Sequence, residues 1–269
     1  MQKDRPIGVF DSGIGGLTVV KALKEILPYE DIVYLGDTAR LPYGTKSKEI
    51  ITKFAFQDAR FLLSRNVKLI IIACHTASSV ALYELSRDLD VPVIGVIEPG
   101  ARAAVSLTKN NRIGVIGTPA TIQAGEYEKA IRKYKKNVEI IAKSTPLFVP
   151  LVEEGWVEHR ITEMVIKEYL QPLKEDRIDT LLLGCTHYPL LKKPLQKFFG
   201  DKTILVDPGY QTALEAKNLL FKEKLIREEK RISLHRFYLT DLSPNFKKIG
   251  ESFLGEPMGD VIRASLQEE

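Results

Sequence analysis

Short apolar runs alternate with amphipathic stretches along the whole chain. The apolar runs have the length of buried strands and predict eight of them, at 6–10, 31–36, 68–73, 92–96, 112–116, 138–142, 179–183 and 203–206. Between them, 47–65 has one apolar face after a candidate N-cap at Ser47, and Thr118 with Pro119 opens a predicted helix over 119–134. This alternation predicts an α/β fold with parallel sheets, helices on both faces, and ligands bound beyond the carboxyl ends of the strands.

Several features of the chain occur twice in the same order. The offsets between the copies are 106, 107, 111 and 109 residues, for the pairs Ile7-Gly8-Val9 and Ile113-Gly114-Val115, Thr38 and Thr145, Cys74 and Cys185, and Glu98-Pro99-Gly100 and Asp207-Pro208-Gly209. Similar junctions recur in unrelated α/β proteins, but four pairs in register favour an internal duplication. We therefore expect two similar α/β domains, one from 1–97 plus 208–269 and one from 98–207, with a strand and a short helix in the tail beyond about residue 232.

The composition narrows the class of protein. With 269 residues and 44% hydrophobic positions, the chain can bury a large core in two domains. A net charge of +4 is ordinary, and the basic runs at 132–136 and 222–224 fit solvated helix faces, so no nucleic-acid partner is expected. No apolar run approaches the roughly 18 residues of a membrane span, and the strand at Ile7 leaves no room for a signal peptide. We expect a cytoplasmic protein with reduced thiols.

The only two cysteines, Cys74 and Cys185, each follow a predicted strand and precede a helix start. A lone cysteine in such a place is usually part of the core. Two at equivalent positions of a repeat instead predict a pair of acid/base groups that act on opposite faces of one carbon. A helix N-terminus is expected to lower the pKa of such a thiol from about 8.5 toward neutrality. His187, two residues after Cys185, is placed to orient or protonate that thiol.

Two loops at the predicted ligand edge carry further candidates. The loop Asp11–Gly16 is rich in glycine but lacks the spacing of a nucleotide or dinucleotide site, so it predicts binding of a small carboxylate, or else only a tight turn. Asp37 opens a second turn-rich loop that ends at Gly44, and Glu153 lies in its counterpart in the second copy. Either carboxylate is expected to assist proton transfer or to be merely solvated. The histidines and cysteines show no metal-ligand spacing, and no lysine suggests a pyridoxal Schiff base, so neither metal nor cofactor is expected.

At these residues the chain resembles the glutamate racemases, which belong to the cofactor-independent aspartate/glutamate racemase superfamily. The matching segments run in family order over about three quarters of the chain: I-G-V-F-D-S-G-I-G-G-L-T-V, Y-L-G-D-T-A-R-L-P-Y-G, V-I-G-V-I-E-P-G, G-V-I-G-T-P-A-T, P-L-F-V-P-L-V-E-E-G and D-T-L-L-L-G-C-T-H-Y-P-L-L. The resemblance implies two α/β domains related by a pseudo-twofold axis, with the active site in the cleft between them. It also implies racemisation of L-glutamate and D-glutamate without a cofactor, which supplies D-glutamate for peptidoglycan.

The resemblance assigns roles to individual residues. Cys74 would act on D-glutamate and Cys185 on L-glutamate. Asp11 and His187 would assist the nearer thiol, and Asp37 and Glu153 would be more loosely placed. The residues that would line the substrate site are Ser12, Pro42, Tyr43, Gly44, Thr76, Thr118, Thr121 and Thr186. The expected partner is the small-molecule substrate, and a homodimer is the assembly to be tested.

One departure from the family pattern stands beside the first thiol. The family usually has A-C-N-T-A-S where this chain has Ala73–Ser78 with His75 at the asparagine position, a substrate-contacting position. We expect a neutral imidazole to take over the N–H donor role of the asparagine, and we expect it to titrate near neutrality. Two other functions stay open: an aspartate-preferring racemase of the same superfamily, and a non-catalytic regulator that binds dicarboxylic amino acids.

Overall fold

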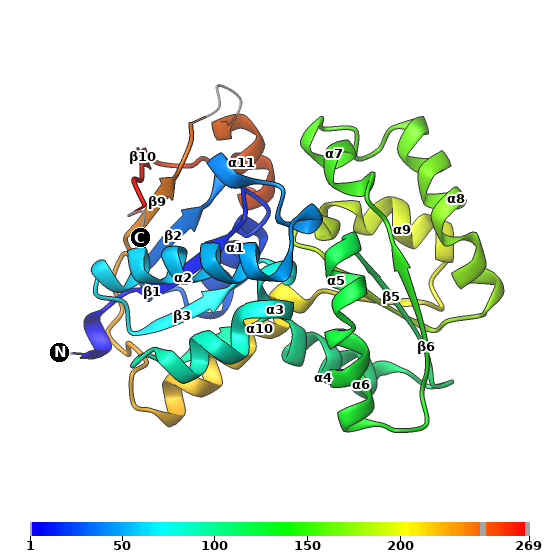
Figure 1. Cartoon of the computed structure of the whole chain (residues 1–269), viewed down its shortest axis with the longest axis horizontal. Coiled ribbons are helices and arrows are strands. Elements are labelled where there is room, and N and C mark those ends of the chain that lie inside the picture. The colour runs from blue at the N-terminus through cyan, green and yellow to red at the C-terminus, as the bar shows by residue number, and fades with distance from the viewer. Residues whose placement is uncertain (1, 243–245, 267–269) are drawn as a thin grey trace.

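The computed structural model describes residues 2–242 and 246–266, and it has the expected α/β architecture (Figure 1). The strands are β1 (Ile7–Asp11), β2 (Ile32–Gly36), β3 (Leu69–Ile72), β4 (Val93–Gly95), β5 (Arg112–Gly117), β6 (Glu139–Ser144), β7 (Thr180–Gly184), β8 (Ile204–Val206), β9 (His235–Leu239) and β10 (Val261–Arg263). The helices are α1 (Leu17–Ile26), α2 (Lys48–Ser64), α3 (His75–Asp88), α4 (Ile97–Leu107), α5 (Pro119–Ala124), α6 (Glu126–Tyr134), α7 (Phe148–Glu153), α8 (Arg160–Glu175), α9 (Lys192–Phe199), α10 (Pro208–Lys222) and α11 (Phe246–Leu254). All eight strands that the sequence predicts are present.

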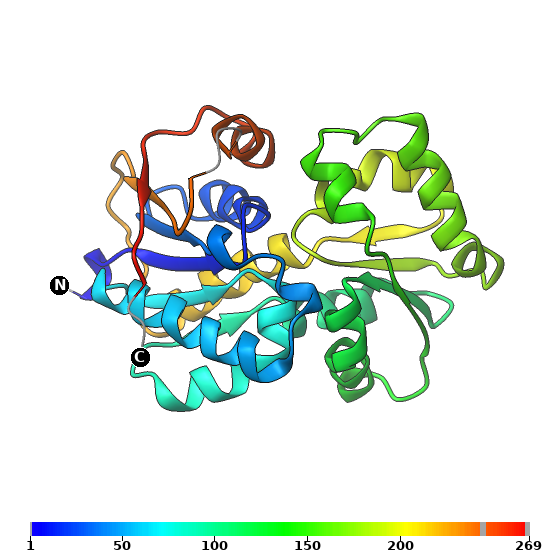
Figure 2. The same ribbon diagram turned by 45° about the horizontal axis from the view of Figure 1, so that its top comes forward.

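The strands form two parallel sheets that occupy separate lobes (Figure 2). The first sheet has the order β10-β9-β2-β1-β3-β4, and the second has the order β6-β5-β7-β8. Strands β2-β1-β3-β4 of the first sheet therefore correspond one by one to β6-β5-β7-β8 of the second. The equal order is what an internal duplication produces, with β9 and β10 added at one edge of the first sheet.

Two local expectations were incomplete. The predicted helix over 119–134 is two helices, because Gly125 adopts a left-handed conformation with φ of 67° and ends α5 before α6 begins. The tail contains β10 as well as the expected strand and helix, which are β9 and α11. Ser47 caps α2 as predicted, since its Oγ accepts the Ile50 N–H at 3.4 Å.

Each of the two helices that connect the sheets packs on the lobe opposite to the strand that it follows. Helix α4 comes after β4 of the first sheet but packs on β7, β8 and α6, and α10 comes after β8 of the second sheet but packs against α1 and β4. The two helices also touch each other at the repeated Pro-Gly triplets, where a Cβ on Gly100 would lie 2.8 Å from Pro208 Cβ. As a result one buried apolar cluster runs through both lobes, while a second fills the α2–α3 face of the first sheet. None of the helices in the described residues combines the length and the apolar character that crossing a membrane requires.

Candidate active site between the two lobes

Both thiols lie at the carboxyl end of a strand. Cys74 follows β3 and caps α3, while Cys185 follows β7 and precedes the short 3-10 helix Tyr188–Leu191. Both residues are buried, at 5% and 6% exposure. Because β3 and β7 hold equivalent places in the two sheets, the thiols occupy equivalent positions, as the repeat predicts.

The Cys74 thiol has uncharged hydrogen-bond partners. Its Sγ accepts the Ala77 N–H at 3.5 Å and donates to Ser12 Oγ at 3.5 Å. Burial raises the pKa of Cys74 to about 12, with the Asp11 carboxylate acting in the same direction. The expectation of a pKa lowered toward neutrality was therefore wrong for this thiol, because burial outweighs the helix N-terminus.

Asp11 connects the two lobes. It is the last residue of β1 and is 1% exposed. One oxygen accepts the Gly13 N–H at 2.9 Å, and the other accepts the Thr186 hydroxyl at 3.4 Å. The Thr18 hydroxyl crosses the same boundary to the Thr186 carbonyl at 3.1 Å. Burial raises the pKa of Asp11, although His187 and the Gly13 N–H act in the opposite direction.

The Cys185 thiol adjoins a charged pair. His187 Nδ1 lies 3.7 Å from Cys185 Sγ, and His187 Nε2 lies 3.0 Å from a Glu153 carboxylate oxygen. Burial alone would lower the pKa of His187, but the hydrogen bonds to Cys185 and Glu153 outweigh burial and raise it from 6.5 to about 10. The imidazole is therefore protonated at neutral pH and places a positive charge beside the Cys185 sulfur.

Three threonine hydroxyls meet where α3 of the first lobe faces α5 of the second. Thr76 Oγ1 lies 3.1 Å from Thr118 Oγ1 and 3.2 Å from Thr121 Oγ1, and the last two are 3.0 Å apart. Gly44 packs against the same cluster, since a Cβ at this position would lie 3.0 Å from Thr118 Cβ. The structure thus brings together predicted site residues from distant parts of the chain.

The loop that begins at Asp37 is anchored by a buried network that the sequence interpretation missed. Arg40 donates to Asp37 at 2.6 Å and to Asp58 at 3.0 Å, and the Tyr43 hydroxyl donates to both carboxylates. Asp37 and Asp58 are fully buried, and burial together with Asp37 raises the pKa of Asp58 well above its usual value. In the sequence, Asp58 falls on the apolar face of α2, and this position was the signal that could have predicted a buried carboxylate. The Tyr43 hydroxyl is hydrogen-bonded within this network, so a substrate contact at this residue would have to use its backbone. Pro42 is exposed.

His75 is the first residue of α3, and its Nδ1 lies 2.7 Å from the Tyr127 hydroxyl of the second lobe. His75 is 4% exposed, and this burial lowers its pKa to about 3. The expectation that this imidazole titrates near neutrality was wrong, because nothing charged compensates for its burial. The hydrogen bond to Tyr127 engages Nδ1, so a substrate contact by this ring would have to use Nε2.

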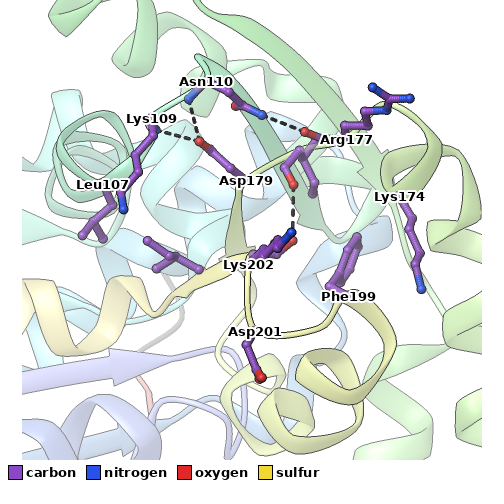
Figure 3. A pocket seen from close by; sticks show the side chains of 12 residues that line it. Leu107, Lys109, Asn110, Lys174, Arg177, Asp179, Phe199, Asp201 and Lys202 are labelled. Atoms are coloured by element: carbon purple, nitrogen blue, oxygen red, sulfur yellow. Dashed lines mark hydrogen bonds between the residues drawn. The ribbon is translucent and has the colours of Figure 1, made fainter.

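A hollow of about 680 Å³ lies at the amino ends of β7 and β8, whereas the Cys185 thiol follows the carboxyl end of β7; Figure 3 shows the side chains that line this hollow. Basic side chains of Lys109, Arg177 and Lys202 surround it, and the Asp179 carboxylate within it is occupied by the backbone N–H groups of residues 109 and 110. None of the predicted site residues lines it. Within residues 2–242 and 246–266, no three His, Cys, Asp or Glu side chains gather as a metal site would require.

Comparison with known proteins agrees with this geometry. The Asp/Glu/Hydantoin racemase family matches residues 7–214. A glutamate racemase from Geobacter metallireducens is 45% identical over 98% of both chains. The crystal structure of glutamate racemase from Francisella tularensis in complex with D-glutamate is 45% identical, covers 98% of both chains and superposes with a TM-score of 0.92. An aspartate racemase homologue from Pyrococcus horikoshii shares the fold, with a TM-score of 0.59 at 17% identity over 80% of this chain and 98% of its own.

The fold and the paired thiols are those of a cofactor-independent amino-acid racemase. The chain belongs to the Asp/Glu/hydantoin racemase family.

Proposed function

We propose that the protein is a glutamate racemase in which Cys74 and Cys185 act on opposite faces of the substrate α-carbon. The observation that carries the proposal is the placement of the two thiols at equivalent sheet ends, each followed by a residue that hydrogen-bonds to the other lobe. Its full-length relatives named glutamate racemase, 43% to 49% identical, support glutamate as the substrate. The product serves peptidoglycan synthesis.

The two directions of the reaction use the thiols in opposite order. With L-glutamate, a thiolate at Cys185, stabilised by the His187 imidazolium, removes the α-proton. The protonated Cys74 thiol then delivers its proton to the other face. With D-glutamate, Cys74 must act as the base, and the α-ammonium group of the bound amino acid supplies the positive charge that favours its thiolate. Each turnover exchanges the protonation states of the two sulfurs, and proton exchange with water returns the free protein to its starting form before the next turnover in the same direction.

The remaining site residues hold the substrate. The hydroxyls of Ser12, Thr76, Thr118 and Thr121, together with the backbone at Tyr43-Gly44, would hold the two carboxylates. Thr186 would orient Asp11 beside Cys74, and Glu153 would fix His187 beside Cys185. Hydrogen-bond donors at the α-carboxylate also stabilise the carbanion that develops as the proton leaves.

The decisive experiment uses L-glutamate in deuterated water without added pyridoxal phosphate or metal. We expect D-glutamate that carries solvent deuterium at the α-carbon, and kcat/KM at least about 100-fold lower for either aspartate enantiomer. Equal or better turnover of aspartate would make the protein an aspartate racemase. Tight glutamate binding without α-proton exchange would make it a regulator.

Three further expectations belong with this function. The domains would be 1–97 plus 208–269 and 98–207, which hydrogen-exchange protection on the two sheets can test. The protein would reside in the cytoplasm, where cell fractionation would find it. It would form a homodimer at micromolar concentration, which sedimentation can measure.

A further inference from the structure

Tyr127 lies between the two thiol sites. It is in the first turn of α6, in the lobe that carries Cys185, and it is 2% exposed. Its hydroxyl reaches across the lobe boundary to His75, the residue that follows Cys74, at 2.7 Å. The two rings are tilted by 39° with centroids 5.9 Å apart, so the contact is a hydrogen bond rather than a stack.

The ring of the same tyrosine lies beside the strand end that carries the second thiol. A Cβ on Gly184, the residue before Cys185, would lie 3.3 Å from Tyr127 Cε2. Burial raises the pKa of Tyr127 well above 10, and the Cys185 thiol contributes to this shift. One side chain thus contacts the residue after Cys74 and the residue before Cys185.

The hydrogen bond also fixes the state of the imidazole. His75 is neutral because burial lowers its pKa to about 3, and the phenol stays protonated. Among the described residues the Tyr127 hydroxyl is hydrogen-bonded to His75, and a buried hydroxyl whose proton finds no acceptor is costly. The hydroxyl therefore donates to Nδ1, which leaves the proton of the neutral ring on Nε2.

We propose that Tyr127 is a positioning residue for racemisation: it holds His75 as the Nε2–H tautomer, with that N–H directed to the substrate beside Cys74. The proposal rests on the proposed function and adds to it a residue outside the substrate site. In the alternative, Tyr127 only fills space between the lobes and its hydroxyl has no effect on proton transfer.

The first test uses the wild-type protein and needs no substitution. Nitrogen-15 NMR of the histidine rings distinguishes the two neutral tautomers and the imidazolium. We expect the His75 signals of an Nε2–H tautomer at pH 6 and at pH 8. An Nδ1–H tautomer, or a protonated ring at pH 6, overturns the proposal.

The second test removes only the hydroxyl. Tyr127→Phe keeps the ring beside Gly184, and we expect kcat/KM to fall about tenfold. The fall must be equal in both directions, since the two enantiomers have equal free energy. The informative readout is the α-deuterium isotope effect on kcat/KM, which should rise with D-glutamate and fall with L-glutamate because the step at Cys74 becomes the slower one. These ratios do not depend on how much of the variant is folded.

The matched control is Tyr188→Phe. Tyr188 is equally buried, and its hydroxyl bonds to Thr145 within its own lobe at 2.7 Å. We expect this variant to lose stability without changing the balance of the two isotope effects. If Tyr127→Phe leaves that balance unchanged, the tyrosine is a packing residue and the proposal is wrong.

A double-mutant cycle with His75→Asn completes the design. Without the imidazole, Tyr127→Phe should lower kcat/KM by less than about twofold further, because its partner is gone. An unchanged tenfold loss in that background overturns the proposal. Neither result bears on the proposed function, which fails only if the wild-type protein does not racemise glutamate.

Discussion

The two halves of the active site share a backbone frame and differ in charge. Cys74 is hydrogen-bonded to a serine hydroxyl and a backbone N–H, and burial raises its pKa to about 12. Cys185 instead adjoins His187, which is paired with Glu153 and protonated at neutral pH. Two copies of one fold unit therefore place one thiol among uncharged hydrogen-bond partners and the other beside a positive charge.

The largest expected effect comes from removing the acid/base group of either half of the active site. Cys74→Ser or Cys185→Ser should reduce racemisation by at least about 1,000-fold, because a hydroxyl is far too weakly acidic to replace a thiol. Polarimetry with either enantiomer measures the loss. Retention of more than about a tenth of the wild-type rate in either variant contradicts a two-base mechanism.

The second largest effect is expected from removing the charge that distinguishes the Cys185 half from the Cys74 half. His187→Gln keeps a hydrogen-bonding group near Cys185 but removes the positive charge, and we expect kcat/KM to fall about 100-fold. Glu153→Gln should cost less, about tenfold, since this carboxylate acts through the histidine and is partly exposed. Equal losses for the two variants would show that the pair acts as a unit, and a negligible loss for His187→Gln would remove its role.

The same histidine should appear in the pH dependence of stability. Its folded pKa of about 10 lies above its ordinary value of 6.5, so the folded state binds the proton more tightly. The stabilisation is complete below pH 6.5 and is lost as the pH rises through about 10. Urea unfolding of the wild type from pH 6 to pH 10 should show this decline, and His187→Gln should flatten it. A steeper decline in the variant is the contrary result.

His75 sharpens the comparison because it is a histidine next to Cys74 whose pKa is lowered, whereas the pKa of His187 beside Cys185 is raised. His75→Asn restores the residue usual in the family and should stay within about tenfold of wild type, whereas His75→Ala should cost about 1–3 kcal/mol in transition-state stabilisation. Since the pKa of His75 is about 3, the acid limb of the pH–rate profile above pH 5 should be the same in His75→Asn and wild type. A shifted limb would mean that the imidazole titrates during turnover.

The smallest effect concerns the substrate loop of the first half. Burial raises the pKa of Asp58 and thereby favours its neutral form, so the neutral Asp58→Asn variant should change the free energy of unfolding by less than about 1 kcal/mol. Asp58→Ala removes one hydrogen-bond acceptor from Arg40 and one from Tyr43, although both side chains keep Asp37, and should cost about 1–3 kcal/mol. Chemical denaturation compares the two, and equal costs would mean that Asp58 is ionised.

The sequence predicted what depends on local pattern and on the repeat: the strands, the equivalent thiols, the Ser47 cap and the substrate-edge loops. It could not predict which effect dominates at a buried group. The helix N-terminus at Cys74 suggested a lowered pKa, but the desolvation that raises it depends on how deeply the folded protein buries this thiol. Tyr127 gave no signal, because its role depends on a contact with His75, 52 residues away in the chain. Asp58 gave a weak signal, as a carboxylate on an apolar helix face.

The crossed helices α4 and α10 have a consequence for how the chain folds during synthesis. A nascent chain that ends before Pro208 already contains both four-strand units, yet α1 and β4 still lack the helix that covers them. The first lobe can therefore be completed only after the second, and truncation before α10 should expose apolar surface and favour aggregation. A fragment that ends before α10 should therefore not yield a stable first lobe.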